Sequence, residues 1–202
     1  LYGNRLNTEN TYLNGINSLK ASCYLIYENG QVNIEQYYEI NRTADTLNEE
    51  QLKSKIVELL SDSIKLRFRS DAPVGTCLSG GFDSSSIVSL SSTLYTGSLE
   101  TFSAVWQEKN CDESYYIDIV NLTYGCSPNK IIPVVNEFAD VFEDLCYYQE
   151  LPTEGPGLYP QWYVMKEAGK KVKVLLDGQG GDEVFGGYFQ MGAYLRGIIK
   201  DR

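Results

Sequence analysis

The chain has 202 residues, of which 43% are hydrophobic, and this is enough to bury the core of one domain of ordinary size. Seventeen Lys and Arg against 27 Asp and Glu give a formal net charge of -10, which argues against a nucleic-acid partner. The sequence has no apolar run of membrane-spanning length, no histidine, and five cysteines without the spacing of zinc or redox sites. We therefore expect a cytoplasmic protein without a membrane partner, whose chemistry uses carboxylates, backbone groups and a cofactor.

The first 48 residues are predicted to form a short β-hairpin followed by a linker. Two apolar runs, residues 23–27 and 32–37, flank a turn that contains Asn29 and Gly30. The polar stretch that ends at Asn48 breaks this pattern. We place a domain boundary there, which gives an incomplete first domain of residues 1–48 and a second domain of residues 49–202.

The second domain is predicted to alternate strands and helices. Apolar residues at helical spacing, and a capping box of Thr46 and Glu49, predict a helix that runs to about Arg69. Strands are expected at 74–78, 101–105, 130–134 and 172–176, and helices at 84–95, 112–124, 136–148 and 158–168. This alternation predicts an α/β fold, a parallel sheet with helices on both faces.

Residues 79–85 read Ser-Gly-Gly-Phe-Asp-Ser-Ser and join a predicted strand to a predicted helix. Gly80 and Gly81 let backbone N–H groups approach an anion, the helix N-terminus adds partial positive charge, and serine hydroxyls add donors. The loop lacks the lysine of a Walker A sequence, so it does not predict transfer of the terminal phosphoryl group. It predicts an ATP-phosphate loop with another chemistry; the alternative is a Ser- and Gly-rich turn in which Asp83 only caps the helix.

A second loop, residues 177–188, follows the last predicted strand and holds five glycines in twelve residues. Such a loop suits close approach of backbone to a ligand at the carboxyl edge of a parallel sheet. Asp182 would lie at the same edge as Asp83, and Mg²⁺ prefers oxygen ligands. We predict that these two carboxylates hold a magnesium ion; the alternative is a solvated glycine turn with surface acids.

Together the two loops resemble the synthetase domain, of the ATP pyrophosphatase type, of glutamine-hydrolysing asparagine synthetases. The likeness extends through residues 102–104, 112–113 and Pro152, and back into residues 12–38, which resemble the end of the family's glutaminase domain. The resemblance implies a fold like that of the adenine nucleotide alpha hydrolases, with ATP and Mg²⁺ as cofactors. It also implies an amide ligase that adenylates the side-chain carboxylate of aspartate, releases pyrophosphate, and lets ammonia from a glutaminase domain displace AMP.

The resemblance also implies roles for individual residues. The catalytic residues would be Asp83, Gln179 and Asp182, and the magnesium ligands Asp83 and Asp182. The cofactor-binding residues would be Cys77, Ser79, Gly80, Gly81, Asp83, Ser84, Ser85, Ala104, Asp177, Gly178 and Tyr188. Asp112 and Glu113 could contribute to the nucleotide site or could simply favour a helix N-terminus. A homodimer is compatible with the family, but the sequence does not give the oligomeric state.

The sequence departs from the family pattern at four places. Gln179 stands where these synthetases often have glutamate, and Lys20 begins a Lys-Ala-Ser run in place of a Pro-Gly element. The chain begins with Leu1 rather than the catalytic cysteine of the glutaminase, and ends at Arg202 before the family's catalytic lysine. We therefore expect a fragment that lacks full activity alone. Two alternatives stay open: a related β-lactam-forming or peptide-cyclising enzyme that activates another carboxylate, and a nucleotide-binding module without turnover.

Overall fold

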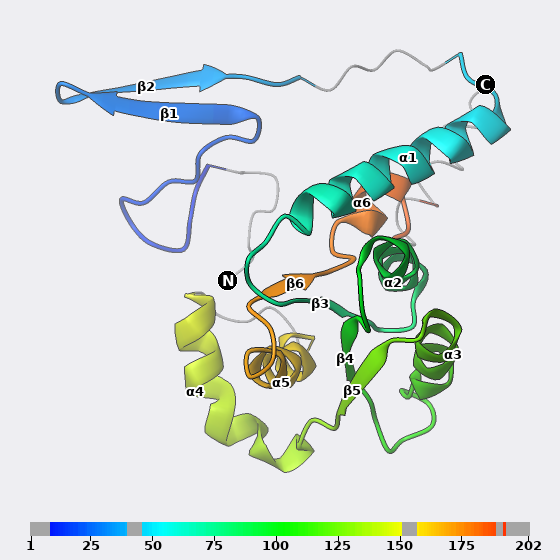
Figure 1. Cartoon of the computed structure of the whole chain (residues 1–202). Helices are drawn as coiled ribbons and strands as arrows, with labels where there is room; N and C mark the ends of the chain where they lie inside the picture. Colours follow the sequence, from blue (N-terminus) through cyan, green and yellow to red (C-terminus); the bar gives the residue numbers. More distant parts are fainter. Residues whose placement is uncertain (1–8, 40–45, 151–156, 189–191, 193–202) are drawn as a thin grey trace. The chain divides into compact units, whose positions relative to one another are not determined.

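The computed structural model describes residues 9–39, 46–150, 157–188 and 192 (Figure 1). The chain divides into two compact units, Leu1–Asn48 and Glu49–Arg202. The placement of one unit relative to the other is not determined, so each is described by itself.

The first unit contains an antiparallel hairpin of β1 (Cys23–Glu28) and β2 (Gln31–Gln36). The two residues between the strands, Asn29 and Gly30, both have positive φ angles, of 54° and 80°. An Asn-Gly pair in this conformation matches the twist of the flanking strands. The predicted hairpin is thereby confirmed.

The second unit is built on a four-stranded parallel sheet with the strand order β5-β4-β3-β6. The strands are β3 (Val74–Cys77), β4 (Glu100–Ala104), β5 (Ser127–Ile131) and β6 (Val174–Leu176). At the centre of the sheet Gly75 leaves no room for a side chain, since a Cβ there would lie 2.9 Å from the Phe102 ring and 3.0 Å from the Glu100 carbonyl oxygen. The absence of a side chain at Gly75 lets Phe102 and the backbone of β4 approach β3 closely.

Helices cover both faces of this sheet (Figure 1). They are α1 (Glu49–Arg67), α2 (Phe82–Leu94), α3 (Ser114–Tyr124), α4 (Phe138–Gln149), α5 (Leu158–Ala168) and the short α6 (Gly181–Phe185), with a 3₁₀ turn η1 (Val135–Glu137) before α4. On one face α5 packs against β4 and β5, and on the other α2 packs against β3. The predicted α/β architecture, a parallel sheet between layers of helices, is confirmed.

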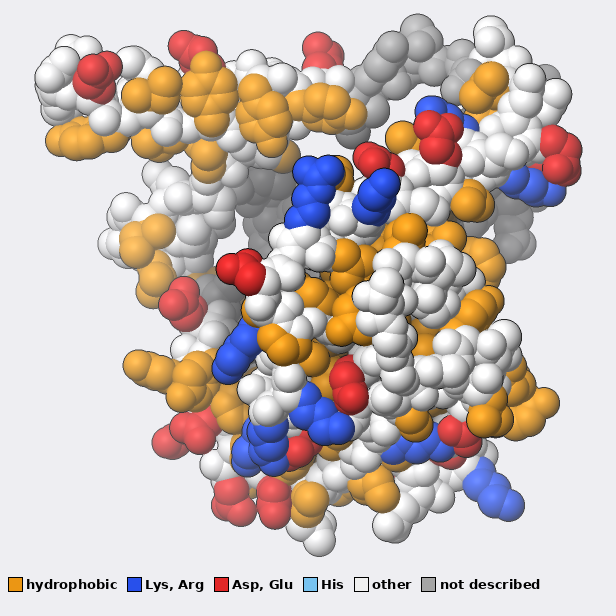
Figure 2. All heavy atoms as spheres, in the orientation of Figure 1, with side chains coloured by type: hydrophobic (Ala, Val, Ile, Leu, Met, Phe, Trp, Pro, Cys, Tyr) orange, Lys and Arg blue, Asp and Glu red, His pale blue; other side chains and the backbone are white. Residues whose placement is uncertain are grey.

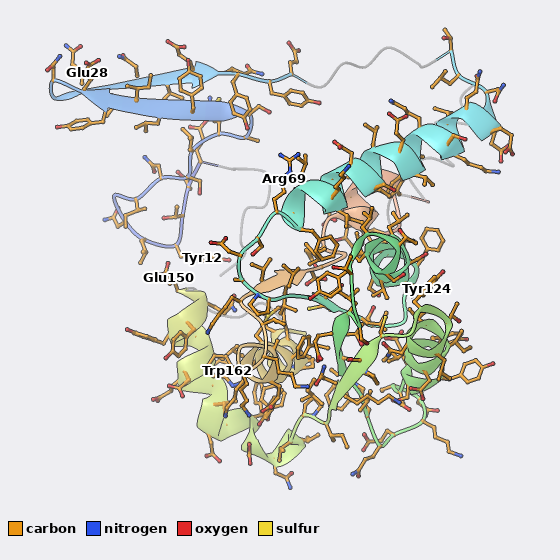
Figure 3. All side chains as sticks on the ribbon, viewed as in Figure 1. Tyr12, Glu28, Arg69, Tyr124, Glu150 and Trp162 are labelled. Atoms are coloured by element: carbon orange, nitrogen blue, oxygen red, sulfur yellow. The ribbon has the colours of Figure 1, made fainter. Side chains whose placement is uncertain are left out.

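Three apolar clusters hold the layers together. Phe102 packs with Val164 of α5 on one face, and the other face carries two clusters, one around Leu78 and Ile117 and one in which Ile64 of α1 meets β3 and β6. Figure 3 shows the side chains that fill the space between the sheet and α5, with Trp162 on the side of α5 toward α4. This core fixes the carboxyl ends of β3, β4 and β6 relative to one another, and the site is built there.

The structure differs from the prediction in several details, among them the three that follow. The third strand spans Ser127–Ile131 rather than residues 130–134, because this edge strand is polar at its start and its Asn129 side chain donates to the Thr101 carbonyl oxygen at 3.0 Å. Helix α1 begins at Glu49 rather than directly after Thr46. The second glycine-rich loop also contains α6, which is too short for helical periodicity to reveal.

The surface of the second unit carries charges of both signs. On α1, Lys53 pairs with Glu49 and Lys55 with Glu58 at 2.8 and 2.9 Å. Figure 2 shows acidic and basic side chains interspersed over the drawn face rather than gathered into one basic patch. Within the described ranges, no helix combines the length and apolar character needed to cross a membrane.

Candidate functional site

A pocket of about 430 Å³ opens at the carboxyl edge of the parallel sheet, at the ends of β3, β4 and β6. Most of the residues that the sequence nominated for the site line this pocket: Cys77, Ser79, Asp83, Ser84, Ala104, Asp177, Gly178, Gln179, Asp182 and Tyr188. Gly80, Gly81 and Ser85 do not line it. The structure therefore brings residues from distant parts of the chain together at one edge, as open α/β sheets do for ligands.

The first loop, residues 78–85, is held by hydrogen bonds among its own members. The buried Ser84 hydroxyl accepts the N–H of Ser79 at 3.2 Å, lies 2.9 Å from the Ser79 hydroxyl and donates to the Gly81 carbonyl oxygen at 3.3 Å. The Ser79 hydroxyl also accepts the Gly81 N–H at 3.3 Å. These bonds close the turn between β3 and α2 without any ligand.

Two glycines shape this turn. Gly80 has φ of +84°, and a Cβ on it would lie 3.0 Å from the Cβ of Tyr116 on α3. Gly81 is the N-cap of α2 and places no side chain over the first turn of the helix. The N-terminus of a helix of 13 residues therefore faces the loop with backbone donors suited to an anion. Gly80 and Gly81 act through backbone shape, which explains why neither lines the pocket.

The second loop packs directly on the first. A Cβ on Gly178 would lie 2.9 Å from the Ser84 backbone nitrogen, and a Cβ on Gly181 would lie 2.5 Å from the carboxylate carbon of Asp83. The Asp83 side chain, which belongs to α2, thus rests on the start of α6. The two loops thus form one packed structure, in which Gly178 and Gly181 of the second loop have no room for a side chain because the first loop fills that space.

The residues that could hold Mg²⁺ are Asp83 and Asp182. Both line the pocket, and the Asp83 carboxylate touches Gly181, the residue before Asp182. No group of three His, Cys, Asp or Glu side chains able to hold a metal exists within the described residues. This arrangement fits Mg²⁺ rather than an ion that needs a full protein cage, since Mg²⁺ commonly binds one or two carboxylates and completes its shell with water and phosphate oxygens.

The pocket is strongly acidic. Of the described residues that line it, five are Asp or Glu and none is Lys or Arg; the acids are Asp83, Glu113, Asp177, Asp182 and Glu183. Burial, and secondarily the charge of Asp177, raises the pKa of the Cys77 thiol to about 12. The Cys77 thiol is therefore neutral at physiological pH and cannot serve as a nucleophile. An anionic ligand in this pocket depends on backbone donors and on cations that accompany it.

The structure adds pocket residues that the sequence analysis missed. Trp106 lies directly after a predicted strand, so its position at the carboxyl edge could have been predicted. The backbone N–H of Trp106 donates to Asp112 Oδ1 at 3.2 Å. The hydrogen bond from the Ser114 hydroxyl, and secondarily the one from this backbone N–H, hold the pKa of Asp112 below its ordinary value. Asp112 thus positions Trp106 and the start of α3, whereas Glu113 lines the pocket.

The first turn of α5 contributes two further pocket residues, Pro160 and Gln161, and no local sequence pattern predicts them. Pro152 lies outside the described residues.

The second loop ends in a phenol–carboxylate pair. The Tyr188 hydroxyl donates to Glu183 Oε1 at 2.5 Å, and both residues line the pocket. This hydrogen bond lowers the pKa of Glu183 and raises that of Tyr188. Glu183 was not nominated from the sequence, since a single acid next to Asp182 carries no signal of its own.

The chain resembles known proteins over most of its length. The asparagine synthetase (glutamine-hydrolysing) 1 of Bacillus subtilis is 32% identical over 171 residues, which cover 83% of this chain and 26% of that protein. The asparagine synthetase (glutamine-hydrolysing) 3 of the same organism is 24% identical over 188 residues, which cover 86% and 31%. The chain therefore spans about a quarter to a third of the length of these relatives.

A likeness to a solved structure is weaker. The NH3-dependent NAD synthetase of Campylobacter jejuni, in complex with the nitrate ion, shows 14% identity and a TM-score of 0.46 over 67% of this chain and 60% of that one. The fold assignment rests instead on the strand order and pairing described above. The asparagine synthase family model matches residues 55–198, well over half of the chain and including both glycine-rich loops. The chain belongs to the asparagine synthase family.

Proposed function

We propose that this domain is the ATP-binding part of an amide ligase that adenylates a carboxylate, in the first instance the side chain of aspartate. The carboxylate oxygen attacks the α-phosphorus of ATP, a P–O bond forms, and pyrophosphate leaves with the electron pair of the bond that breaks. Ammonia then attacks the acyl carbon, the C–N bond forms, AMP leaves, and the nitrogen loses a proton to give the amide of asparagine.

One observation carries this proposal: the two glycine-rich loops are packed into a single structure around one pocket. Gly178 lies against the Ser84 backbone nitrogen and Gly181 against the Asp83 carboxylate. A loop at a helix N-terminus without a Walker lysine suits binding of a pyrophosphate leaving group more than transfer of the terminal phosphate. A second loop in contact with it puts Gln179 and Asp182 into the same pocket.

The residues of this chain divide the work by their chemistry. The backbone N–H groups at the start of α2 would bind the outer phosphates. The hydroxyls of Ser79 and Ser84 bond each other, and that of Ser84 also bonds the Gly81 carbonyl oxygen, so they would turn a proton toward the phosphates to join them. Ala104 offers an apolar surface for the adenine. Gln179 would orient the acyl substrate. Mg²⁺, if held by Asp83 and Asp182, would neutralise charge on the phosphates and so favour departure of pyrophosphate.

A second candidate follows from Gln179, which lines the pocket where related synthetases often have glutamate. A neutral amide donates as well as accepts hydrogen bonds, whereas a carboxylate only accepts. This change alters which acyl group can be oriented, and it favours a related enzyme of the β-lactam-forming or peptide-cyclising kind acting on another carboxylate. A nucleotide-binding module without turnover remains a third reading of the same pocket.

ATP–pyrophosphate exchange in the complete natural protein separates these candidates. Exchange that requires aspartate supports the first, and exchange that requires another carboxylic acid supports the second. Tight ATP binding without exchange supports the third. Formation of ADP and phosphate in step with substrate turnover contradicts adenylation altogether.

The wider setting of the reaction is also part of the proposal. Ammonia would come from a glutaminase domain, since the relatives are named as glutamine-hydrolysing, and the reaction would take place in the cytoplasm. The cysteines Cys23, Cys77, Cys111, Cys126 and Cys146 are all free thiols, in keeping with a reducing compartment. Sedimentation of the complete protein would show whether it forms a homodimer.

A further inference from the structure

The side chains of Glu183 and Tyr188, at the end of the second loop, present hydrogen-bond acceptors to the pocket. The Tyr188 hydroxyl is the one donor of this pair, and it bonds Glu183. Tyr188 donates its hydroxyl proton to Glu183 Oε1 at 2.5 Å, and both side chains line the pocket. A phenol carries a single proton, so an oxygen that has donated it can only accept, and an ionised carboxylate can only accept. The pair therefore offers lone pairs, and no proton, to a ligand.

The backbone of the loop holds the two residues at this distance. The N–H of Val184 bonds the Gly180 carbonyl oxygen at 3.1 Å, which winds α6 around Glu183, and the N–H of Gly187 bonds the Asp182 carbonyl oxygen at 3.0 Å, which folds the chain back toward Tyr188. A Cβ on Gly187 would lie 1.9 Å from Asp182 Oδ1, so the return also needs a residue without a side chain. The phenol–carboxylate contact is thus built into the loop.

Anionic groups are poor partners for this end of the pocket. A phosphate or a carboxylate would set acceptor against acceptor, in a pocket whose described lining residues include four acids besides Glu183 and no Lys or Arg. A positively charged or neutral amine has N–H groups that match the lone pairs. Charge-assisted hydrogen bonds of this kind are among the stronger ones in proteins.

We propose that Glu183 and Tyr188 form an amine subsite, in which Tyr188 and Glu183 accept hydrogen bonds from N–H groups of a reactant and Glu183 fixes the phenol as an acceptor. The proposal rests on the proposed function, and it gives the chemistry of one end of that pocket. The amine has two sources in such a reaction: the α-ammonium group of an amino-acid acyl substrate, or the ammonia that attacks the adenylate. ATP is not a ligand of the subsite, so this proposal replaces the expectation that Tyr188 binds the nucleotide.

The variants Glu183→Gln and Tyr188→Phe test the subsite in the complete protein. Glu183→Gln keeps an oxygen that can accept the phenol proton but removes the negative charge and adds N–H donors. Tyr188→Phe removes the phenol oxygen and keeps the ring. Glu143→Gln and Tyr147→Phe, at exposed positions of α4, are the matched controls. Thermal melting checks that all four variants fold.

Kinetics distinguish the two sources of the amine. If the subsite binds the α-ammonium group, both variants raise the KM for the acyl substrate in ATP–pyrophosphate exchange, about tenfold for loss of one charge-assisted hydrogen bond. If it binds the nucleophile, exchange is unchanged and the KM for ammonium in amide formation rises by a similar factor. In both cases the KM for ATP stays within about twofold of wild type. A rise confined to the KM for ATP, or no change beyond that of the controls, overturns the proposal.

A binding measurement keeps this test separate from that of the proposed function. If the subsite binds the α-ammonium group, the wild-type protein with ATP bound should bind aspartate more tightly than succinate, which lacks the amine, and Tyr188→Phe should remove the difference. This comparison needs no turnover. If the wild-type protein catalyses no exchange, the ligase proposal fails, and ammonia is no longer a candidate ligand of the subsite. Equal affinity for aspartate and succinate would then overturn the amine subsite as well. A preference for aspartate that is lost in Tyr188→Phe supports the subsite whether or not exchange occurs.

Discussion

The two loops that form the pocket reach their conformations in different ways. Residues 78–85 are stabilised within the loop, through the hydroxyls of Ser79 and the buried Ser84, and the loop starts from Leu78, which is 1% exposed. Residues 177–188 depend on contact with the first loop, through Gly178 and Gly181, and α6 leaves its Val184 76% exposed. The first loop is a local structure, whereas the second is shaped on it.

This difference has a consequence for changes in each loop. A substitution in the first loop that removes hydrogen bonds weakens a turn that still has the packing of β3 and α2 beneath it. A substitution at the contact between the loops displaces the second loop together with every pocket residue that it carries. We therefore expect the largest effects from residues that join the two loops and smaller effects from residues within either one.

The largest effect is expected at the proposed metal site, where Asp83 of the first loop and Asp182 of the second would hold the same ion. The double variant Asp83→Asn, Asp182→Asn keeps side-chain size but removes both charged oxygen ligands. We expect Mg²⁺-dependent ATP–pyrophosphate exchange to fall about a thousandfold, since metal neutralisation of phosphate charge contributes several kcal/mol. ATP binding without divalent ions should instead become tighter, because two acids leave a pocket with no Lys or Arg among its described lining residues.

Asp140→Asn, Asp144→Asn on the exposed side of α4 is the matched double control, and should leave both measurements unchanged. Full Mg²⁺-dependent exchange in the Asp83, Asp182 variant would show that neither carboxylate holds the metal. Calorimetric titration with ATP, with and without Mg²⁺, reports the opposite changes in the two conditions.

Gly178→Ala tests the contact itself. Its Cβ would lie 2.9 Å from the Ser84 backbone nitrogen and 3.1 Å from the Asp83 carbonyl carbon, so backbone rather than a flexible side chain must move. Overpacking costs about 1–3 kcal/mol of folding free energy. Displacement of reacting groups by about 1 Å can cost about a hundredfold in rate, which is the loss of exchange that we expect. Gly192→Ala, where a Cβ meets no atom of the described residues within 4 Å, is the control; exchange at the wild-type rate in Gly178→Ala would separate the two loops functionally.

The same difference explains how much the sequence could predict. The first loop, its flanking β3 and α2 and the parallel sheet follow from local signals: apolar runs, a glycine pair and a helix start. The exact start of β5 does not, because its residues from Ser127 to Lys130 form no apolar run. The pocket residues of α5 do not either, since Pro160 and Gln161 reach the site only through packing of α5 on β4. Their placement depends on contacts between distant segments.

Within the first loop, Ser84→Ala should have a moderate effect. It removes the acceptor of the Ser79 N–H and the partner of the Ser79 hydroxyl, at a residue only 6% exposed. We expect about 1 kcal/mol less stability, and a loss of ATP affinity of about fivefold as the loop loosens. Ser86→Ala is matched, because that hydroxyl bonds only the Phe82 carbonyl oxygen of its own helix in the described structure. Chemical denaturation and ATP titration measure the two effects, and equal results for Ser84→Ala and Ser86→Ala would contradict the loop's self-stabilisation.

The smallest expected effect is that of the Asp177 charge, at the start of the second loop, on the pKa of Cys77 at the end of β3. Burial raises the pKa of the Cys77 thiol to about 12, and the negative charge of Asp177 adds to this because it disfavours a thiolate. Asp177→Asn removes that charge and should lower the Cys77 pKa, so the thiolate fraction at a given alkaline pH rises. Alkylation of Cys77 by iodoacetamide should then become faster by a small factor, with the exposed Cys111 as the internal reference for reagent reactivity. Burial remains in the variant, so Cys77 should still react more slowly than Cys111. A Cys77 rate that is unchanged or lower in Asp177→Asn would mean that the Asp177 charge does not act on the end of β3.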